Sequence, residues 1–139
     1  MSAAAKAYFG RRYVLSASHR LHVDTLTDEE NRAAYGKCNN PHGHGHNYVV
    51  EVLVGGPVDA DTGMVVSLAD LDAIVNTQVV ERFDHQNLNH DAAFATQPPT
   101  TENFCRLVFG LLKDALPLGE LASVRMEETE NNAFECTSA

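Results

Sequence analysis

The sequence predicts an α+β fold, in which a four-stranded antiparallel sheet carries two helices on one face in the chain order ββααββ. Two observations support this fold class. Strand-type runs stand near both ends of the chain, and two segments between them repeat apolar residues at the helical spacing. No repeat, low-complexity tract or linker divides the 139 residues, so we expect a single domain over residues 1–139.

The four strands are predicted from residue types and turn signals. Residues 7–18, AYFGRRYVLSAS, are rich in aromatic and β-branched types, and residues 48–54, YVVEVLV, predict a strand that GGPVDADTG ends. Residues 122–136 predict two more strands around Asn131 and Asn132, which tolerate the positive φ of a tight turn. A sheet this small has exposed edges, so edge-to-edge association of copies into a ring is a plausible remedy.

A short helix is predicted in the long insertion between the first two strands. Thr27 can cap the first turn of TDEENRAAYG, Glu30 completes a capping box, and Gly36 suits the exit. This helix is additional to the two long ones.

The two long helices follow the second strand. One begins at Ser67 and runs to about Phe83. The other begins with Thr100 as its cap and ends before Pro117. Their apolar stripes need no cofactor to explain them, and they comprise Leu71, Ile74, Val75 and Val79 in the first helix and Phe104, Leu107, Val108, Leu111 and Leu112 in the second.

The charge balance excludes some classes of partner. Ten basic against nineteen acidic residues give a formal net charge of -9, which argues against a general nucleic-acid or anionic-membrane surface. No stretch approaches the roughly 18 apolar residues of a transmembrane helix, and the first residues lack the apolar run of a secretory signal. We therefore expect a cytoplasmic protein.

A histidine-rich segment, KCNNPHGHGHNY, is the main candidate for a metal site. His44 and His46 are two residues apart at the start of a strand, so their side chains leave on the same face. His19 ends the first strand, and antiparallel pairing of the two strands brings it close to them. Three neutral imidazoles suit zinc and leave a fourth position open, as in catalytic sites, whereas a paired surface feature is the simpler alternative.

The neighbouring cysteine has two possible roles. Cys38 lies in a loop six residues before His44, and a nearby metal would depress its pKa and make a thiolate base. As a fourth ligand it would instead close the site and make it structural. Cys105 on a helix and Cys136 near the end of the chain are expected to be a core residue and a bystander. The remaining candidates near the site, His22, His42 and His90, are expected to be solvated loop histidines.

Carboxylates supply two further candidates. Asp84 stands beside His85 in FDHQNLN, and a carboxylate next to an imidazole is the arrangement of a proton relay, although helix capping by Asp84 explains the spacing equally well. In the strand that contains MEET, Glu127 and Glu128 point to opposite faces, so at most one of them faces a pocket.

Seven motifs carry a resemblance to a known family. SASHRL, DEEN, GKCNNPHGHGHNY, DADTGMVVSLADL, DHQNLN, TTEN and EETENN occur in this order between residues 16 and 132. Together they resemble the 6-pyruvoyl-tetrahydropterin synthase family over most of the chain. In the related 6-carboxy-tetrahydropterin synthases of queuosine biosynthesis the gap between the cysteine and the first histidine is usually shorter, so the spacing here favours the pyruvoyl branch.

The resemblance implies a role for each candidate. It implies the zinc ligands His19, His44 and His46, and a catalytic triad of Cys38 as base with Asp84 and His85. It further implies that Glu128 anchors the pterin through paired hydrogen bonds, with Thr100, Thr101 and Glu102 lining the same pocket.

The reaction implied by the resemblance is the conversion of 7,8-dihydroneopterin triphosphate to 6-pyruvoyl-tetrahydropterin with elimination of triphosphate, a step of tetrahydrobiopterin biosynthesis. It implies one Zn²⁺ per subunit, Mg²⁺ with the triphosphate, and the tunnelling fold, in which subunits join their sheets into a barrel and two trimers form a homohexamer. Candidates for the triphosphate by charge and dipole alone are Arg20, Lys37 and the amides at the Thr100 helix start. Two alternatives stay open: the carboxy-tetrahydropterin reaction, and a non-enzymatic zinc- or pterin-binding module.

Overall fold

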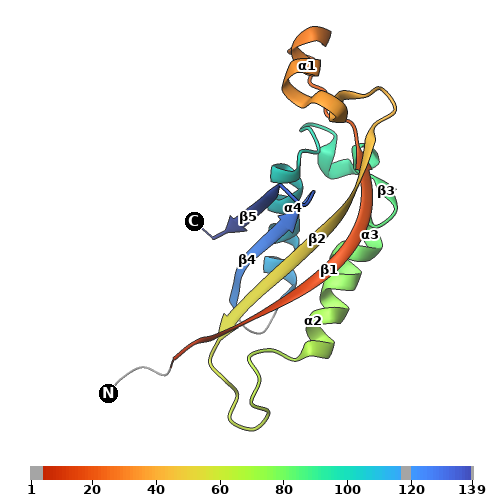
Figure 1. Cartoon of the computed structure of the whole chain (residues 1–139). Coiled ribbons are helices and arrows are strands. Elements are labelled where there is room, and N and C mark those ends of the chain that lie inside the picture. Colours follow the sequence, from red (N-terminus) through yellow and green to blue (C-terminus); the bar gives the residue numbers. More distant parts are fainter. Residues whose placement is uncertain (1–4, 117–119, 139) are drawn as a thin grey trace.

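The fold is known from a computed structural model that describes residues 5–116 and 120–138. Its five strands are β1 (Ala7–His19), β2 (His44–Gly56), β3 (Gln86–Asn87), β4 (Glu120–Glu127) and β5 (Ala133–Thr137). They form one sheet in the order β3-β1-β2-β4-β5 (Figure 1). The predicted α+β class is confirmed. The prediction of a purely antiparallel four-stranded sheet was incomplete, because β3 pairs in parallel with β1 and makes the sheet mixed.

The sequence did not predict β3, and the reason is physical. β3 contains two residues, which is too short to show the alternation by which a strand is recognised. β3 pairs with Ala17 and Ser18 because helix α3, which precedes it, ends beside the edge of β1. The four longer strands pair antiparallel, as predicted.

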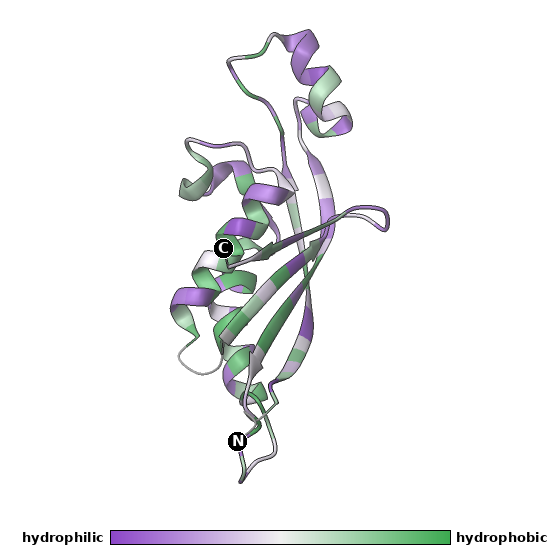
Figure 2. Cartoon of the chain, turned by 90° about the vertical axis from the view of Figure 1, so that its left-hand side faces the viewer, coloured by the Kyte–Doolittle hydropathy of each residue, from purple (hydrophilic) through white to green (hydrophobic). Residues whose placement is uncertain are grey.

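Helices cover one face of the sheet and extend beyond one end of it. The helical elements are α1 (Asp28–Tyr35), α2 (Leu68–Val75), α3 (Glu81–Phe83) and α4 (Thr101–Ala115), the π-helical turn η2 (Asn76–Val80), and the 3₁₀ turns η1 (Gly36–Asn39), η3 (Leu88–His90) and η4 (Ala92–Phe94). In Figure 2 the green, hydrophobic segments gather on the strands and the helices beside them, whereas α1 at the top is largely purple. Of the described residues, no helix is long and apolar enough to cross a membrane.

The predicted helix from Ser67 to Phe83 is continuous but contains the π-helical turn η2. Its fully buried positions recur at a strict spacing of four: Leu71, Val75, Val79 and Phe83. In a straight α-helix a step of four residues drifts by about 40° around the axis. The wider π turn absorbs part of this drift, so the whole stripe can stay against the sheet.

The short helix in the insertion forms as predicted. The Thr27 side chain accepts a hydrogen bond from the Glu30 amide, and the Glu30 carboxylate accepts one from the Thr27 amide. Buried Asn31 holds this helix to the preceding loop through hydrogen bonds with both backbone groups of Val23. The insertion is therefore an ordered part of the structure beside the strand ends.

The core lies between the sheet and helices α2, α3 and α4. Alternate residues of β2 are fully buried, as expected for a strand with one covered face: Tyr48, Val50, Val52 and Val54. On α4, Phe104 is the hub of an aromatic cluster whose ring centroids lie 5.3 Å from Tyr48, 5.0 Å from Phe83 and 6.3 Å from Phe94.

We expect Phe104→Ala to lower the free energy of unfolding by about 3–5 kcal/mol, because it removes a fully buried ring and leaves a cavity. Urea denaturation followed by circular dichroism measures this change. The matched control is Val14→Ala in β1, where the side chain is 66% exposed and the expected change is within about 0.5 kcal/mol. Equal losses in the two variants would contradict a core centred on Phe104.

Candidate active site

The pairing of β1 with β2 brings the histidines together. His19 lies directly opposite His44, and His46 lies opposite Ala17, two residues earlier on β1. The expectation that antiparallel pairing places the end of the first strand beside the start of the second is thereby confirmed. All three histidines stand on the face of the sheet that continues into the core at Tyr48.

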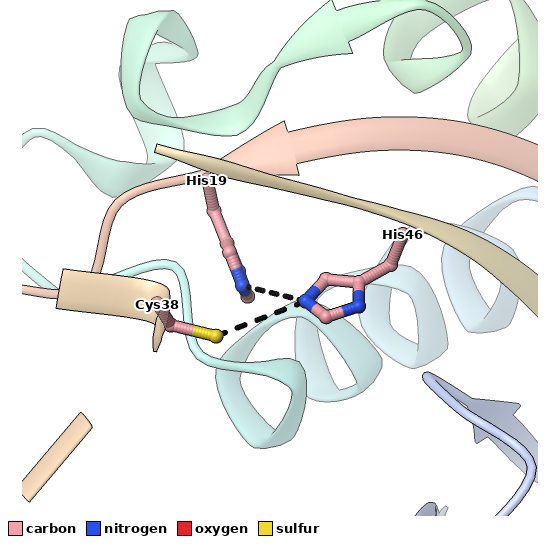
Figure 3. Close-up of side chains that lie close together, drawn as sticks. All are labelled: His19, Cys38 and His46. Carbon is pink, nitrogen blue, oxygen red and sulfur yellow. Dashed lines mark hydrogen bonds between the residues drawn. The ribbon is translucent and has the colours of Figure 1, made fainter. Parts of the chain in front are cut away.

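His19 is fully buried and held in one orientation. Its Nδ1 lies 2.8 Å from the Pro99 carbonyl oxygen, which can only accept, so Nδ1–H donates and Nε2 keeps its lone pair. That Nε2 points at Nε2 of His46, 3.1 Å away (Figure 3). Burial lowers the pKa of His19 below its ordinary value, although the Pro99 hydrogen bond and the Glu128 charge oppose this change. The ring is therefore neutral at pH 7, the state in which imidazole binds metals.

Cys38 reaches the same point from η1. Its Sγ lies 3.8 Å from His46 Nε2, and the ligand atoms of His19, Cys38 and His46 all fall within 4.8 Å of one another (Figure 3). The backbone fixes this position, since the Leu21 amide donates to the Cys38 carbonyl at 2.7 Å and the Asn39 side chain donates to the Leu21 carbonyl at 2.8 Å. These three residues are a possible metal site.

His44 stands beside this group and outside it. Its ring centroid lies 4.7 Å from that of His46, with the planes nearly perpendicular at 80°, and its side chain is exposed. The sequence favoured three imidazoles with the thiol unbound. In the structure the Cys38 thiol lies with the ring nitrogens of His19 and His46, closer to them than that interpretation requires, and His44 lies at the edge of this group.

The donor set fits zinc. Two nitrogens bound to one tetrahedral Zn²⁺ at about 2.0–2.1 Å stand about 3.3 Å apart, and a bound sulfur and nitrogen stand about 3.6 Å apart. The observed 3.1 Å between the nitrogens of His19 and His46 and 3.8 Å between Cys38 Sγ and His46 Nε2 are close to these values. Two imidazole lone pairs aimed at each other repel unless a cation or a proton lies between them.

The predicted low pKa of Cys38 applies to a site that holds a metal ion, and the protein groups by themselves act in the other direction. Burial raises the pKa of the thiol, and the negative charge of Glu128 raises it further. The protein groups alone therefore favour the neutral thiol. A thiolate at this position needs a cation close by, which is the effect that a bound Zn²⁺ supplies.

Glu128 is the carboxylate that faces the group. It follows the last residue of β4, and the buried Thr101 hydroxyl at the start of α4 donates a hydrogen bond to it. Glu127 lies on the opposite face, where Arg12 and Arg125 bind its carboxylate. The two residues thus separate as strand alternation predicts.

The other predicted members of this pocket lie at the same helix start. Thr100 is the N-cap of α4, and its side chain accepts a hydrogen bond from the Asn103 amide. Glu102 is exposed in the first turn of α4. The structure therefore brings Thr101 into contact with Glu128 and uses the Thr100 hydroxyl as a helix cap.

Asp84 and His85 bond each other directly, at the edge of the sheet. Asp84 Oδ2 accepts from His85 Nδ1 at 3.0 Å, and Oδ1 accepts from the Ser16 amide at 2.8 Å, which contributes most to the lowered pKa of Asp84. His85 adopts a left-handed backbone with φ of 60°, and its side chain is 81% exposed. Strained backbone of this kind persists where neighbouring contacts enforce it, and it is enriched at functional sites.

Two residues that position the site were not recognised in the sequence. The Pro99 carbonyl sets the tautomer of His19, and buried Asn39 ties the segment carrying Cys38 to the chain that follows β1. A backbone carbonyl leaves no sequence signal. The sequence placed Cys38 in a loop, and it gave no sign that Asn39 is buried.

The fold and the site together define an α+β protein with a candidate metal centre, in which two imidazoles, a thiol and a carboxylate face one point at the strand ends. Comparisons with known proteins narrow this class. The sequence model of the family described as 6-pyruvoyl tetrahydropterin synthase matches residues 9–139. The chain belongs to this family, and it is a lyase.

Individual relatives support the assignment. The chain is 47% identical to a 6-pyruvoyl tetrahydrobiopterin synthase of Homo sapiens over 128 residues, covering 91% of this chain and 88% of that one. It is 44% identical to the enzyme of the same name from Drosophila melanogaster over 134 residues, covering 95% and 80%. The solved structure of a Caenorhabditis elegans 6-pyruvoyl tetrahydropterin synthase superimposes with a TM-score of 0.91 over the whole of both chains at 38% identity.

A member of the carboxy branch also matches, over a shorter stretch. The chain is 44% identical to a putative 6-carboxy-5,6,7,8-tetrahydropterin synthase of Archaeoglobus fulgidus over 71 residues, covering 51% of this chain and 56% of that one. The pyruvoyl relatives are thus matched over nearly the whole chain and this carboxy relative over about half of it.

Proposed function

We propose that the chain converts 7,8-dihydroneopterin triphosphate to 6-pyruvoyl-tetrahydropterin with elimination of triphosphate. The observation that carries this proposal is the convergence of two imidazole nitrogens and a thiol within 4.8 Å, with the Glu128 carboxylate facing them, in a chain 47% identical to a synthase of that activity. We also propose that the protein acts in the cytoplasm.

His19, His46 and His44 are the proposed ligands of one Zn²⁺ per subunit. When bound, the ion acts as a Lewis acid that acidifies C–H bonds next to the substrate oxygens it holds. His19 contributes a fixed lone pair, because the Pro99 carbonyl occupies its other nitrogen. The exposed His44 ring completes the set from the solvent side.

Cys38 is the proposed base. Its sulfur faces the same point as the two ring nitrogens, so it can remove a proton from a carbon whose oxygen is held there. Its half-buried position excludes part of the water that competes for that proton. The hydrogen bonds around Leu21 and Asn39 keep the sulfur at this distance.

Glu128 is the proposed anchor of the pterin ring, with Thr101 holding it and with Thr100 and Glu102 at the rim. A carboxylate that accepts two N–H bonds from a guanidine-like edge orients the ring in its own plane. The Thr101 hydroxyl occupies one oxygen of Glu128 and so limits the rotation of the carboxylate. Mg²⁺ bound to the triphosphate is the further cation we expect, because it reduces the repulsion between the substrate and a chain of net charge -9.

Asp84 and His85 are proposed to complete the site from a neighbouring subunit of a homohexamer. Asp84 binds Nδ1 of His85, which leaves Nε2 on an exposed ring free to exchange a proton. Within the described residues, β3 pairs with β1 only at Ala17 and Ser18, so most of the outer edge of β1 is open to another strand. An open edge of this length favours assembly of sheets into a closed barrel.

Mixing two inactive variants tests this shared site. We expect Cys38→Ala and His85→Ala each to lose turnover, and oligomers co-assembled from equal amounts of both to recover about one quarter of the wild-type rate, since one site in four then receives both intact residues. Steady-state assays on oligomers purified through two different tags measure the recovery. No recovery in verified mixed oligomers would place the pair and the thiol in one chain.

Product analysis tests the reaction itself and separates it from the carboxy branch. Incubation of zinc-loaded protein with 7,8-dihydroneopterin triphosphate is expected to yield a pterin of the mass of 6-pyruvoyl-tetrahydropterin together with triphosphate. A carboxylated pterin with acetaldehyde would assign the chain to the carboxy branch. Absence of any product from folded, zinc-loaded oligomer would favour the non-enzymatic binding module.

A further inference from the structure

We propose that a cation-lined cavity next to the metal group binds the triphosphate of the substrate, through Arg20, Arg32 and Lys37. We call it the cation cavity. The inference rests on the proposed function for the identity of its ligand, but the cavity and its charges are independent of that function. It adds Arg32, which no sequence motif singles out, and sets aside the helix start at Thr100, which does not line the cavity.

The cation cavity lies between the turn that carries Cys38 and helix α1. It has a volume of about 560 Å³, within the roughly 300–1,000 Å³ of small-molecule sites. Besides the three cations its lining comprises Asp28, Gly36, Asn39, Asn40, Pro41 and His44. It is open to solvent, and its lining combines the three cationic side chains with the amides of Asn39 and Asn40.

Among the described residues, the cations of the cavity have no carboxylate partner, whereas most arginines outside it have one. Four arginines of the chain bind carboxylates: Arg11, Arg12, Arg82 and Arg125. Within the described ranges, the Arg20 side chain contacts the Asn39 carbonyl and the His22 ring, at 3.4 Å each. In the part of the chain that the structure describes, neither Arg32 nor Lys37 has a carboxylate at ion-pair distance.

This concentration of positive charge is unusual for the chain. Acidic residues outnumber basic ones by nineteen to ten, so unpaired cations gathered in one hollow need a reason. Solvated side chains explain single exposed lysines or arginines, but three around one cavity raise the local positive potential and attract anions. A chain of phosphates, with several oxygens for guanidinium groups to bind in pairs, matches this arrangement.

The position of the cavity suits the leaving group of the proposed reaction. His44 lines it, and the His44 ring lies 4.7 Å from the His46 ring between centroids, so the cavity adjoins the metal group on this side. Lys37 and Asn39 line it and flank Cys38 in the chain. A substrate side chain held at the imidazoles and the thiol can therefore extend its phosphates into the cavity, next to the carbon that loses them.

Asp28 is the one acidic residue in the lining, so removing its charge should change anion affinity in the direction opposite to removing a cation. Without divalent cations its carboxylate repels phosphate, so Asp28→Asn should strengthen anion binding, whereas loss of Arg32 or Lys37 should weaken it. A cavity that recognised shape alone would not respond in opposite directions to these two charge changes.

Calorimetric titration with inorganic tripolyphosphate, without divalent salts, tests the inference on the zinc-loaded full chain. We expect binding that weakens as sodium chloride is raised, a loss of about tenfold in affinity for Arg32→Ala and for Lys37→Ala, and a gain for Asp28→Asn. Lys113→Ala, an exposed lysine at the end of α4, is the matched control and should bind as the wild type does. Zinc content is measured before and after each titration, so that chelation by the probe is not counted as binding.

Kinetics with the substrate provide the second arm. Arg32→Ala should raise KM for 7,8-dihydroneopterin triphosphate about tenfold, while the inhibition constant of unphosphorylated 7,8-dihydroneopterin stays at the wild-type value. Normal tripolyphosphate binding by the cavity variants, in an enzyme that turns over, overturns the inference and leaves the function intact. Selective loss of tripolyphosphate binding in a protein that makes no pterin product supports the cavity as an anion site and overturns the proposed function.

Discussion

Cys38→Ala is expected to lower turnover by about 10²–10⁴-fold, the usual contribution of a general base, while zinc content stays near one ion per chain. The reason is that the Cys38 sulfur is proposed to lie near the zinc ion without being one of its ligands. In the proposed site three histidines hold the metal, and the sulfur of Cys38 is left to act on the substrate. Metal analysis by mass spectrometry and steady-state kinetics on the same preparation measure both quantities.

The matched control is Cys136→Ala, a half-buried cysteine of β5 on a strand remote in the sheet order from β1. It should keep both zinc and turnover, which separates a specific role of Cys38 from general sensitivity to thiol loss. If Cys38→Ala loses zinc together with activity, the sulfur is a ligand, and the site is closed and structural.

The role of Cys38 as a base requires that a bound cation lower the pKa of its thiol. Burial and the Glu128 carboxylate raise the pKa of the thiol, so the protein without metal holds it protonated at neutral pH. A bound cation reverses this preference. We therefore expect iodoacetamide to alkylate Cys38 faster in zinc-loaded than in zinc-free protein, if the sulfur is near the ion and not bonded to it.

The sequence predicted the features of the fold that depend on periodicity and on caps. The long strands, the capping box at Thr27 and the helix that begins after Thr100 all follow from local patterns, and the structure confirms them. It did not predict β3 or the π turn η2. Both arise where one element must adapt to another, the first by pairing two residues with β1 and the second by keeping a four-residue stripe against the sheet.

The candidate site likewise has features that the sequence predicts and features that it does not. That His19, His44 and His46 share one region follows from strand pairing and alternation, which act over the whole β1–β2 ladder. The position of Cys38 next to His46, the Pro99 contact of His19 and the cation cavity depend on how the insertion folds back over the strand ends. No periodic signal encodes such a return of the chain, so the sequence does not predict these features.

His44→Ala is expected to weaken zinc binding by more than about 100-fold, since loss of an outer-shell partner alone typically costs 10–100-fold and a direct ligand should cost more. The fold should survive, because the His44 side chain is exposed and His44 is not one of the core residues. Competition for zinc against a fluorescent chelator measures the affinity, and circular dichroism with gel filtration checks the fold and the oligomer.

His42→Ala is the matched control, because His42 is an exposed histidine two residues earlier in the same segment. It should keep the wild-type zinc affinity. Read with Cys38→Ala, the result assigns the third ligand: zinc lost with His44 and kept without Cys38 gives three imidazoles and an open position for substrate. Zinc kept without His44 and lost without Cys38 gives His19, His46 and the thiol as ligands, and a proton acceptor other than Cys38 must then be found for the reaction.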